Sequence, residues 1–383
     1  MDKRLQSGLS LVEILVGLVI GMLAMLAIFQ TLALFEAQRR TTGEGADMQQ
    51  NGLSALYNLE QDIRLGGYGL IDNGSMPCFN IDDYSTPSIF KSIPVQISDN
   101  AKNGTNSDIL ITARLDSDTG GIVTGGARAK LSAVTGSPAT SIQLDTGRGL
   151  KKNDYIIIAQ PGLDCSLLKV DGAYAYNGTD PTAVAVATVA NPAGGAGNPT
   201  FPGYGATAFI VDIGQPPPSC NNAANPCPPP FATSTYSVSS GNLVQAGTTN
   251  TGTTTSPLVA NIVNIQAQYG VSAAAGSQSV TCWTNATGNA CNPASGDWAN
   301  PNAADFQRVK AIRLAVVARS ALKEKPKGSS CDATTSAPVA WPSVTGQTTP
   351  PTIDLSSDPN WKCYRYKVYS TIVPLRNVIW SNL

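Results

Sequence analysis

Glu13 is a carboxylate at the start of a long apolar run. From Ile14 to Phe35 the sequence contains no charged residue. A helix over 9–35 would be about 40 Å long at roughly 1.5 Å per residue, enough to cross a hydrocarbon layer of about 30 Å. A carboxylate inside a membrane helix costs on the order of 2.5–3.5 kcal/mol, so Glu13 needs a partner or a route to the headgroups. The sequence predicts one membrane-spanning helix and, from the carboxylate alone, leaves both interpretations of Glu13 open.

The cysteines are the second group of residues that could do chemistry: Cys78, Cys165, Cys220, Cys227, Cys282, Cys291, Cys331 and Cys363. With no C-x-x-C pair and no histidine, we expect no metal site. An even count in a chain rich in turn residues predicts up to four disulfides, which persist outside the cytoplasm. Cys220 with Cys227 and Cys282 with Cys291 close short loops and are favoured. Cys78 with Cys165 and Cys331 with Cys363 follow only by elimination among about 105 pairings.

The composition does not favour enzymatic activity, and it does not indicate a class of binding partner. Charged residues are 13% of the 383, the formal net charge is -1, and histidine is absent. The sequence therefore has no strong field for nucleic acid, and it lacks the commonest general base and metal ligand. We expect no enzymatic activity and no cofactor.

For two motifs we prefer a structural interpretation to a functional one. Asp116–Gly121 resembles the start of a calcium loop, but Ala127 stands where the bidentate glutamate is required, so a turn is favoured. Basic residues also cluster late in the chain, and this cluster could contact DNA or an acidic partner. Its members are Arg308, Lys310, Arg313, Arg319, Lys323, Lys325 and Lys327. Their partial alternation along a strand favours a solvated face instead.

The segment 36–66 is predicted to be the amphipathic second half of the long helix and to pack on a globular head. A polar hinge at Thr41–Gly45 is expected to precede it. Apolar or small residues then recur on one helical face, which Leu53 and Tyr57 widen. The face consists of Met48, Gly52, Leu56, Leu59 and Ile63. The glycines within Gly66–Gly69 are expected to end the helix.

Beyond Leu70 the chain is predicted to be rich in β-strands. The expected short strands are Ile109–Thr112, Ser141–Leu144, Tyr155–Ala159, Ala183–Val189 and Phe209–Val211. Surface loops are expected at Asn191–Gly205 and Gly214–Pro230, and a hairpin that turns at Gly241–Asn242. The last third is expected to be more regular, with one run at Leu258–Val271 and two long apolar runs suited to central strands at Val309–Ser320 and Lys367–Val373.

The order of residues from Gly8 to Glu13 resembles the class III leader of type IV prepilins and pseudopilins. Gly8 precedes the apolar run, so cleavage there would retain the helix, unlike an ordinary secretory signal. The resemblance implies that residues 1–8 are a leader, that prepilin peptidase cuts after Gly8, and that it methylates the new N-terminus at Leu9. Many family members have phenylalanine where Leu9 stands. The resemblance also implies that Glu13, as the fifth mature residue, neutralises the N-terminal amine of a neighbouring subunit in the filament.

Four further blocks are similar to minor pilins of the PilW type: Leu59–Tyr68, Ala267–Val271, Val309–Ser320 and Val373–Asn377. This resemblance implies an α+β, type IV pilin-like fold, in which a long N-terminal helix packs on an antiparallel β-sheet head (67–383) with disulfide-bonded loops. The region from about 73 to 257 matches no known pattern, so we expect an elaborated part of the head there.

The implied function is that of a minor pilin that helps initiate a type IV pilus and lies near its tip, supporting attachment, twitching motility or DNA uptake. The implied partners are prepilin peptidase, other minor pilins, the major pilin and a large tip adhesin. The expected location is the inner membrane with the head in the periplasm, then the pilus surface. The alternative is a GspJ-like pseudopilin of a type II secretion system.

Overall fold

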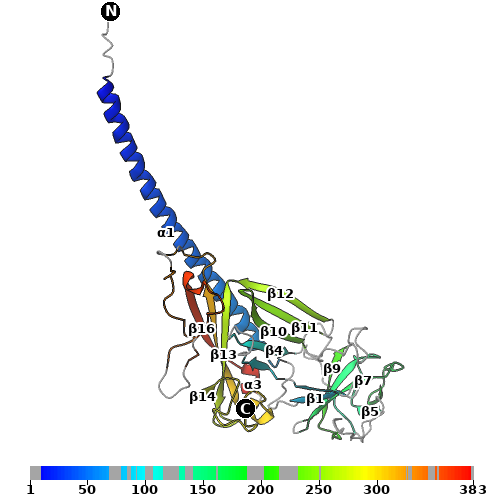
Figure 1. Ribbon diagram of the computed structural model, residues 1–383. Helices are drawn as coiled ribbons and strands as arrows, with labels where there is room; N and C mark the ends of the chain where they lie inside the picture. Colours follow the sequence, from blue (N-terminus) through cyan, green and yellow to red (C-terminus); the bar gives the residue numbers. More distant parts are fainter. Residues whose placement is uncertain are drawn as a thin grey trace, which may run out of the picture.

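The computed structural model has an α+β fold in which one long helix leads into a head of three β-sheets (Figure 1). It describes residues 10–68, 79–83, 88–91, 93–99, 107–114, 129–133, 141–160, 163–187, 202–214, 232–249, 252–324, 326, 330–343, 350–351 and 353–380. Structural statements below concern these residues.

Helix α1 is Leu11–Leu65, 55 residues without interruption. The hinge predicted at Thr41–Gly45 is therefore wrong. A glycine inside a helix costs only about 1 kcal/mol relative to alanine. The apolar run before Gly43 and the packed face after Gly45 both favour a helix. The predicted end is confirmed, because Gly66 is the C-cap and Gly67 has a φ of 79°, which favours glycine.

The four-stranded antiparallel sheet lies against α1. Its order is β14 (Val280–Thr284), β13 (Ile262–Ser272), β15 (Val309–Arg319) and β16 (Tyr366–Pro374). Strands β15 and β16 confirm two of the predicted runs, but only β15 is a central strand, because β16 lies at the edge of this sheet. The third, Leu258–Val271, is wrong as one strand. Asn261 takes a left-handed φ of 60° and divides the run between two sheets.

The five-stranded antiparallel sheet covers another side of α1. Its order is β12 (Gly252–Ala260), β11 (Asn242–Thr249), β10 (Ala232–Ser239), β4 (Ile109–Arg114) and β3 (Val95–Ser98). The predicted hairpin is present as β10 and β11, with its turn at Ser240–Gly241, one residue earlier than predicted. Both turn residues have positive φ, 51° and 74°, as a tight hairpin turn requires.

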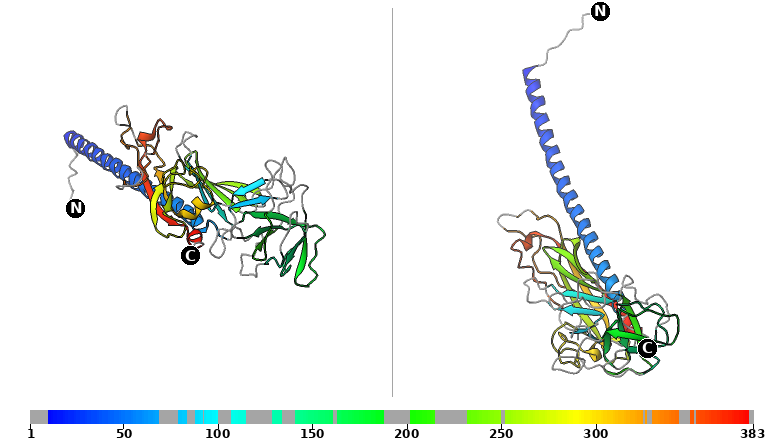
Figure 2. Two further views of the ribbon diagram at one scale, coloured as in Figure 1. Left: turned by 90° about the horizontal axis from the view of Figure 1, so that it is seen from below. Right: turned by 90° about the vertical axis from the view of Figure 1, so that its right-hand side faces the viewer.

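The seven-stranded sheet lies to one side, away from α1 (Figures 1 and 2). Its main path is β2 (Ser88–Lys91), β1 (Asn80–Asp83), β7 (Cys165–Val170), β6 (Tyr155–Ala159) and β9 (Phe209–Gly214). Strand β8 (Thr182–Ala187) pairs with β7 and with β5 (Ser141–Leu144). The region 73–257 is thus shared between this sheet and the five-stranded one. The predicted loops at 191–205 and 214–230 lie largely outside the described residues.

The described part of the head also contains three short helical segments: α2 (Ala303–Arg308), η2 (Trp361–Cys363) and α3 (Arg376–Trp380). Helix α2 begins with a capping box between Asn302 and Asp305.

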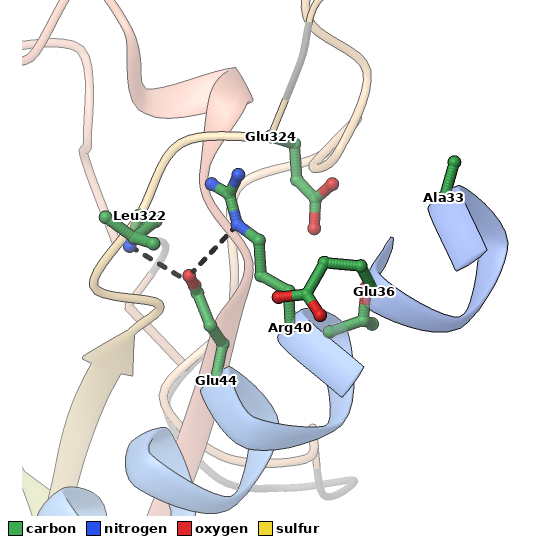
Figure 3. Close-up of a pocket in the computed structure, with 7 residues that line it drawn as sticks. Ala33, Glu36, Arg40, Glu44, Leu322 and Glu324 are labelled. Atoms are coloured by element: carbon green, nitrogen blue, oxygen red, sulfur yellow. Dashed lines mark hydrogen bonds and ion pairs between the residues drawn. The ribbon is translucent and has the colours of Figure 1, made fainter. Parts of the chain in front are cut away.

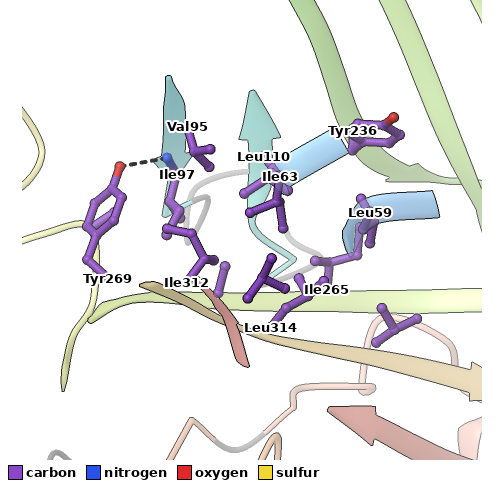
Figure 4. Close-up of a cluster of buried hydrophobic side chains, with 14 of the residues drawn as sticks. Leu59, Ile63, Val95, Ile97, Leu110, Tyr236, Ile265, Tyr269, Ile312 and Leu314 are labelled. Atoms are coloured by element: carbon purple, nitrogen blue, oxygen red, sulfur yellow. Dashed lines mark hydrogen bonds between the residues drawn. The ribbon is translucent and has the colours of Figure 1, made fainter. Parts of the chain in front are cut away.

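The main core lies where the second half of α1 meets two sheets (Figure 4). Leu59 and Ile63 are fully buried there, beside Leu110 of the five-stranded sheet and Ile265 and Leu314 of the four-stranded one. The predicted buried face of α1 is confirmed at these positions.

Leu53 and Tyr57 do not belong to that face. They are 48% and 64% exposed. Each residue turns a helix by about 100°, which carries both side chains past the arc that the sheets cover. The structure therefore leaves two large side chains on the outer side of α1.

Candidate functional site

The first half of α1 is an apolar surface that the chain itself does not cover. Its large apolar side chains, from Leu11 to Phe35, are all more than half exposed. The helix is long and apolar enough to cross a membrane, and none of its most apolar window is buried. Burying such a surface is worth roughly 25 cal/mol per Å², so it requires lipid or other protein around it.

Glu13 lies in the first turn of α1 and is exposed. Ser10 caps the helix, accepting at its side-chain oxygen from Val12 N at 3.3 Å and at its backbone oxygen from Glu13 N at 2.9 Å. A carboxylate in the first turn is favoured by the helix dipole. Gly8 and Leu9 lie outside the described residues, so the leader cleavage stays a prediction.

Gly17 and Gly21 share a helix face with Glu13, because the three residues follow one another at spacings of four. A Cβ added at either glycine would meet nothing within 4 Å. Small residues at this spacing let a second helix approach closely in an apolar medium. These glycines were not predicted from the sequence, although they form a G-x-x-x-G pattern that could have indicated them.

The junction between α1 and the head is fixed by polar contacts to the loop after β15 (Figure 3). Leu322 N donates to Glu44 Oε2 at 3.2 Å, and Arg40 Nη2 donates to the backbone oxygen of Lys323 at 3.0 Å. Arg40 Nε lies 3.7 Å from Glu44 Oε1. These contacts stabilise the helical conformation of the segment that was predicted to be a hinge.

The late basic cluster is largely not the solvated face that we predicted. Lys310 is 1% exposed, and its Nζ donates to the backbone oxygens of Ala275 and Gln307, each at 2.8 Å. Arg308 donates to three backbone oxygens at 2.7–3.1 Å. The alternation of basic residues along this strand was a poor guide to solvent exposure, because β15 lies inside its sheet and both of its faces are covered. Lys325 and Lys327 lie outside the described residues.

Asp108 is a buried carboxyl that connects two sheets. Its Oδ2 accepts from Ala267 N at 2.7 Å, and its own N donates to Ile265 O at 2.8 Å. Loss of hydration on burial raises the pKa of Asp108 to about 8, although the bond from Ala267 acts in the opposite direction. Burial likewise raises the pKa of Asp212 to about 7. Asp212 accepts from Gly214 N at 2.8 Å.

Two disulfides of the head are Cys282–Cys291, which starts from strand β14, and Cys331–Cys363, which ends in η2. Cys165 is also disulfide-bonded. Cys78, Cys220 and Cys227 lie outside the described residues, as does the weighed calcium-loop segment 116–127. Among the residues that the structure places, no group of three or more histidine, cysteine, aspartate or glutamate side chains could hold a metal ion.

The second half of the head matches a known family model, that of PilW, the type IV pilus-assembly protein W. Residues 231–377 match the PilW family. The PilW segment covers β10 to β16 and three of the four predicted blocks, so the PilW prediction is confirmed there. The match links the chain to type IV pilus assembly, and with the apolar helix it fits a membrane-associated protein. No curated protein and no solved structure matches the chain.

Proposed function

We propose that this protein is a minor pilin that helps initiate a type IV pilus and is incorporated near its tip. The observation that carries the proposal is an uncovered apolar half-helix continuous with a half that is packed into a PilW-type head. Such a chain can reside in the inner membrane and later exchange lipid for the helices of other subunits. Disulfides in the head support a periplasmic location, since these bonds persist in oxidising compartments.

In this proposal prepilin peptidase removes residues 1–8 and methylates Leu9, leaving a new amine close to Glu13. Within an apolar helix bundle, an unpaired charge is strongly disfavoured, whereas a carboxylate and an amine from neighbouring subunits neutralise each other. The pair would set the axial register of the incoming subunit. Gly17 and Gly21, on the face of Glu13, would let the neighbouring helix approach closely.

We also propose a non-enzymatic role. Asp108 and Asp212, two carboxyl groups with a raised pKa, each accept a hydrogen bond from a backbone N–H of a sheet. This engagement supports a structural explanation for their burial.

The proposal is tested by Glu13→Ala in cells that assemble pili. Losing one partner of a buried ion pair costs about 3–5 kcal/mol, so we expect the subunit to fall at least roughly tenfold in sheared pili. The total cellular amount should stay unchanged, because Glu13 is exposed in the first turn of α1 and contacts none of the head residues that the structure describes. Glu60→Ala is the matched control, since it removes a half-buried carboxylate, paired with Arg64, from the packed half of the same helix. Wild-type levels of the Glu13 variant in sheared pili would refute the assembly role.

A further inference from the structure

A cavity of about 380 Å³ lies at the junction of α1 and the head (Figure 3). Its wall on the helix includes Ala33, Glu36 and Arg40, and its wall on the head includes Leu322 and Glu324. It therefore combines one guanidinium with carboxylates and has apolar side chains at its edge. Leu322 is 52% exposed, although it belongs to the globular head.

The cavity lies at the depth of lipid headgroups if α1 spans a membrane, as the proposed function requires. At about 1.5 Å per residue, the uncharged run from Ile14 to Phe35 is roughly 33 Å long and fills a hydrocarbon layer of about 30 Å. Glu36 then stands at the boundary, and Arg40 lies roughly 6 Å beyond it. A bilayer with its headgroups is about 40–45 Å thick, so Glu36 and Arg40 span one headgroup layer.

In the described part of the chain, two charged side chains of the cavity, Arg40 and Glu324, are held by partners of their own, whereas Glu36 is not. Arg40 is fixed by Glu44 and by the backbone oxygen of Lys323. Glu324 Oε1 lies 3.0 Å from Arg365 Nε. Among the residues that the structure describes, Glu36 has no ion-pair partner, and it is exposed at the cavity. Figure 3 shows the Glu36 and Glu324 carboxylates on the same side of the Arg40 side chain, opposite Glu44.

We propose that this cavity binds the headgroup of a phospholipid that carries a primary amine. The ammonium group donates hydrogen bonds to the carboxylates of Glu36 and Glu324, and the phosphate lies toward the guanidinium of Arg40. Ala33 and Leu322 contact the first carbons of the acyl chains. A primary ammonium is preferred over a trimethylated one because only the former has N–H donors for the two carboxylates. An anionic headgroup without an amine would place its charge beside them unpaired.

The test uses the full-length protein in nanodiscs that contain equal amounts of phosphatidylethanolamine and phosphatidylcholine. After mild detergent extraction, native mass spectrometry counts the lipids that the protein retains. We expect wild type to retain phosphatidylethanolamine over phosphatidylcholine by roughly tenfold, the ratio that one charge-assisted hydrogen bond can supply. In Glu36→Gln the ratio should fall close to one. Glu60→Gln, on the same helix but away from the cavity, should keep the wild-type ratio.

Equal retention of the two lipids by wild type, or an unchanged ratio in Glu36→Gln, would overturn the lipid site. Preferential retention of phosphatidylglycerol in a matched mixture would do the same. Incorporation of Glu13→Ala into pili is a separate readout, so the lipid site can fail while the pilin proposal stands.

Discussion

The packing of Gly52 against Tyr369 determines how closely α1 can approach the head. A Cβ at position 52 would lie 2.2 Å from Tyr369 Cε2 and 2.3 Å from Cδ2, far inside van der Waals contact. The ring is 9% exposed and belongs to the main core, so it has little room to move away. Overpacking of this kind costs about 1–3 kcal/mol. Gly52→Ala should therefore move the helix or the ring at a cost in stability.

Gly43→Ala is the matched control, because a Cβ at position 43 meets nothing within 4 Å in the same helix. Both variants gain about 1 kcal/mol of helix propensity, so their difference isolates the clash. We expect Gly43→Ala to be up to about 1 kcal/mol more stable than wild type, and Gly52→Ala to be about 1–3 kcal/mol less stable than Gly43→Ala. The assay is urea unfolding of the detergent-solubilised protein with its disulfides oxidised. Equal stability of the two variants would refute the close packing.

Three further predictions follow from the described contacts. The stability of Asp108→Asn relative to wild type should rise from about pH 4 to 8. In that range Asp108 stays protonated in the folded wild-type protein and releases its proton only in the unfolded chain, so wild type alone loses stability as the pH rises. Parallel urea midpoints across that range would contradict it. Replacing Cys331 and Cys363 by serine should cost about 3–4 kcal/mol in urea unfolding, because this disulfide closes a 32-residue separation; a loss below 1 kcal/mol would not fit. Gly21→Leu should reduce incorporation into sheared pili, whereas Val19→Leu, on the other side of α1, should not; equal incorporation would argue against the glycine face.

Much of the fold could be predicted because its signals are local. The ends of β5 and β6 were predicted at the residues where the structure has them, since turn residues bound both apolar runs. The absence of a hinge at Thr41–Gly45 could not be predicted, because Arg40 and Glu44 are fixed by a loop far away in the sequence. Asn261 illustrates a different limit. Its apolar neighbours form one pattern, and only the partners of each half show two strands.

The candidate site divides in the same way. Glu13 could be found from the sequence, because one carboxylate beside an uncharged run is conspicuous. Gly17 and Gly21 carried a recognisable spacing that the analysis did not use. The cavity at the junction had no local signal, since Glu36 and Glu324 meet only when the loop after β15 folds back onto α1. Burial of Lys310 was hidden for a similar reason, because one of its two acceptors, the backbone oxygen of Ala275, lies far away in the sequence.

The most direct test of the account is the intact mass and N-terminal sequence of the protein recovered from sheared pili. The account predicts a chain that begins at methylated Leu9, keeps the whole of α1 and carries its disulfides oxidised. Recovery of the chain with residues 1–8 still attached, from cells with an active prepilin peptidase, would contradict it.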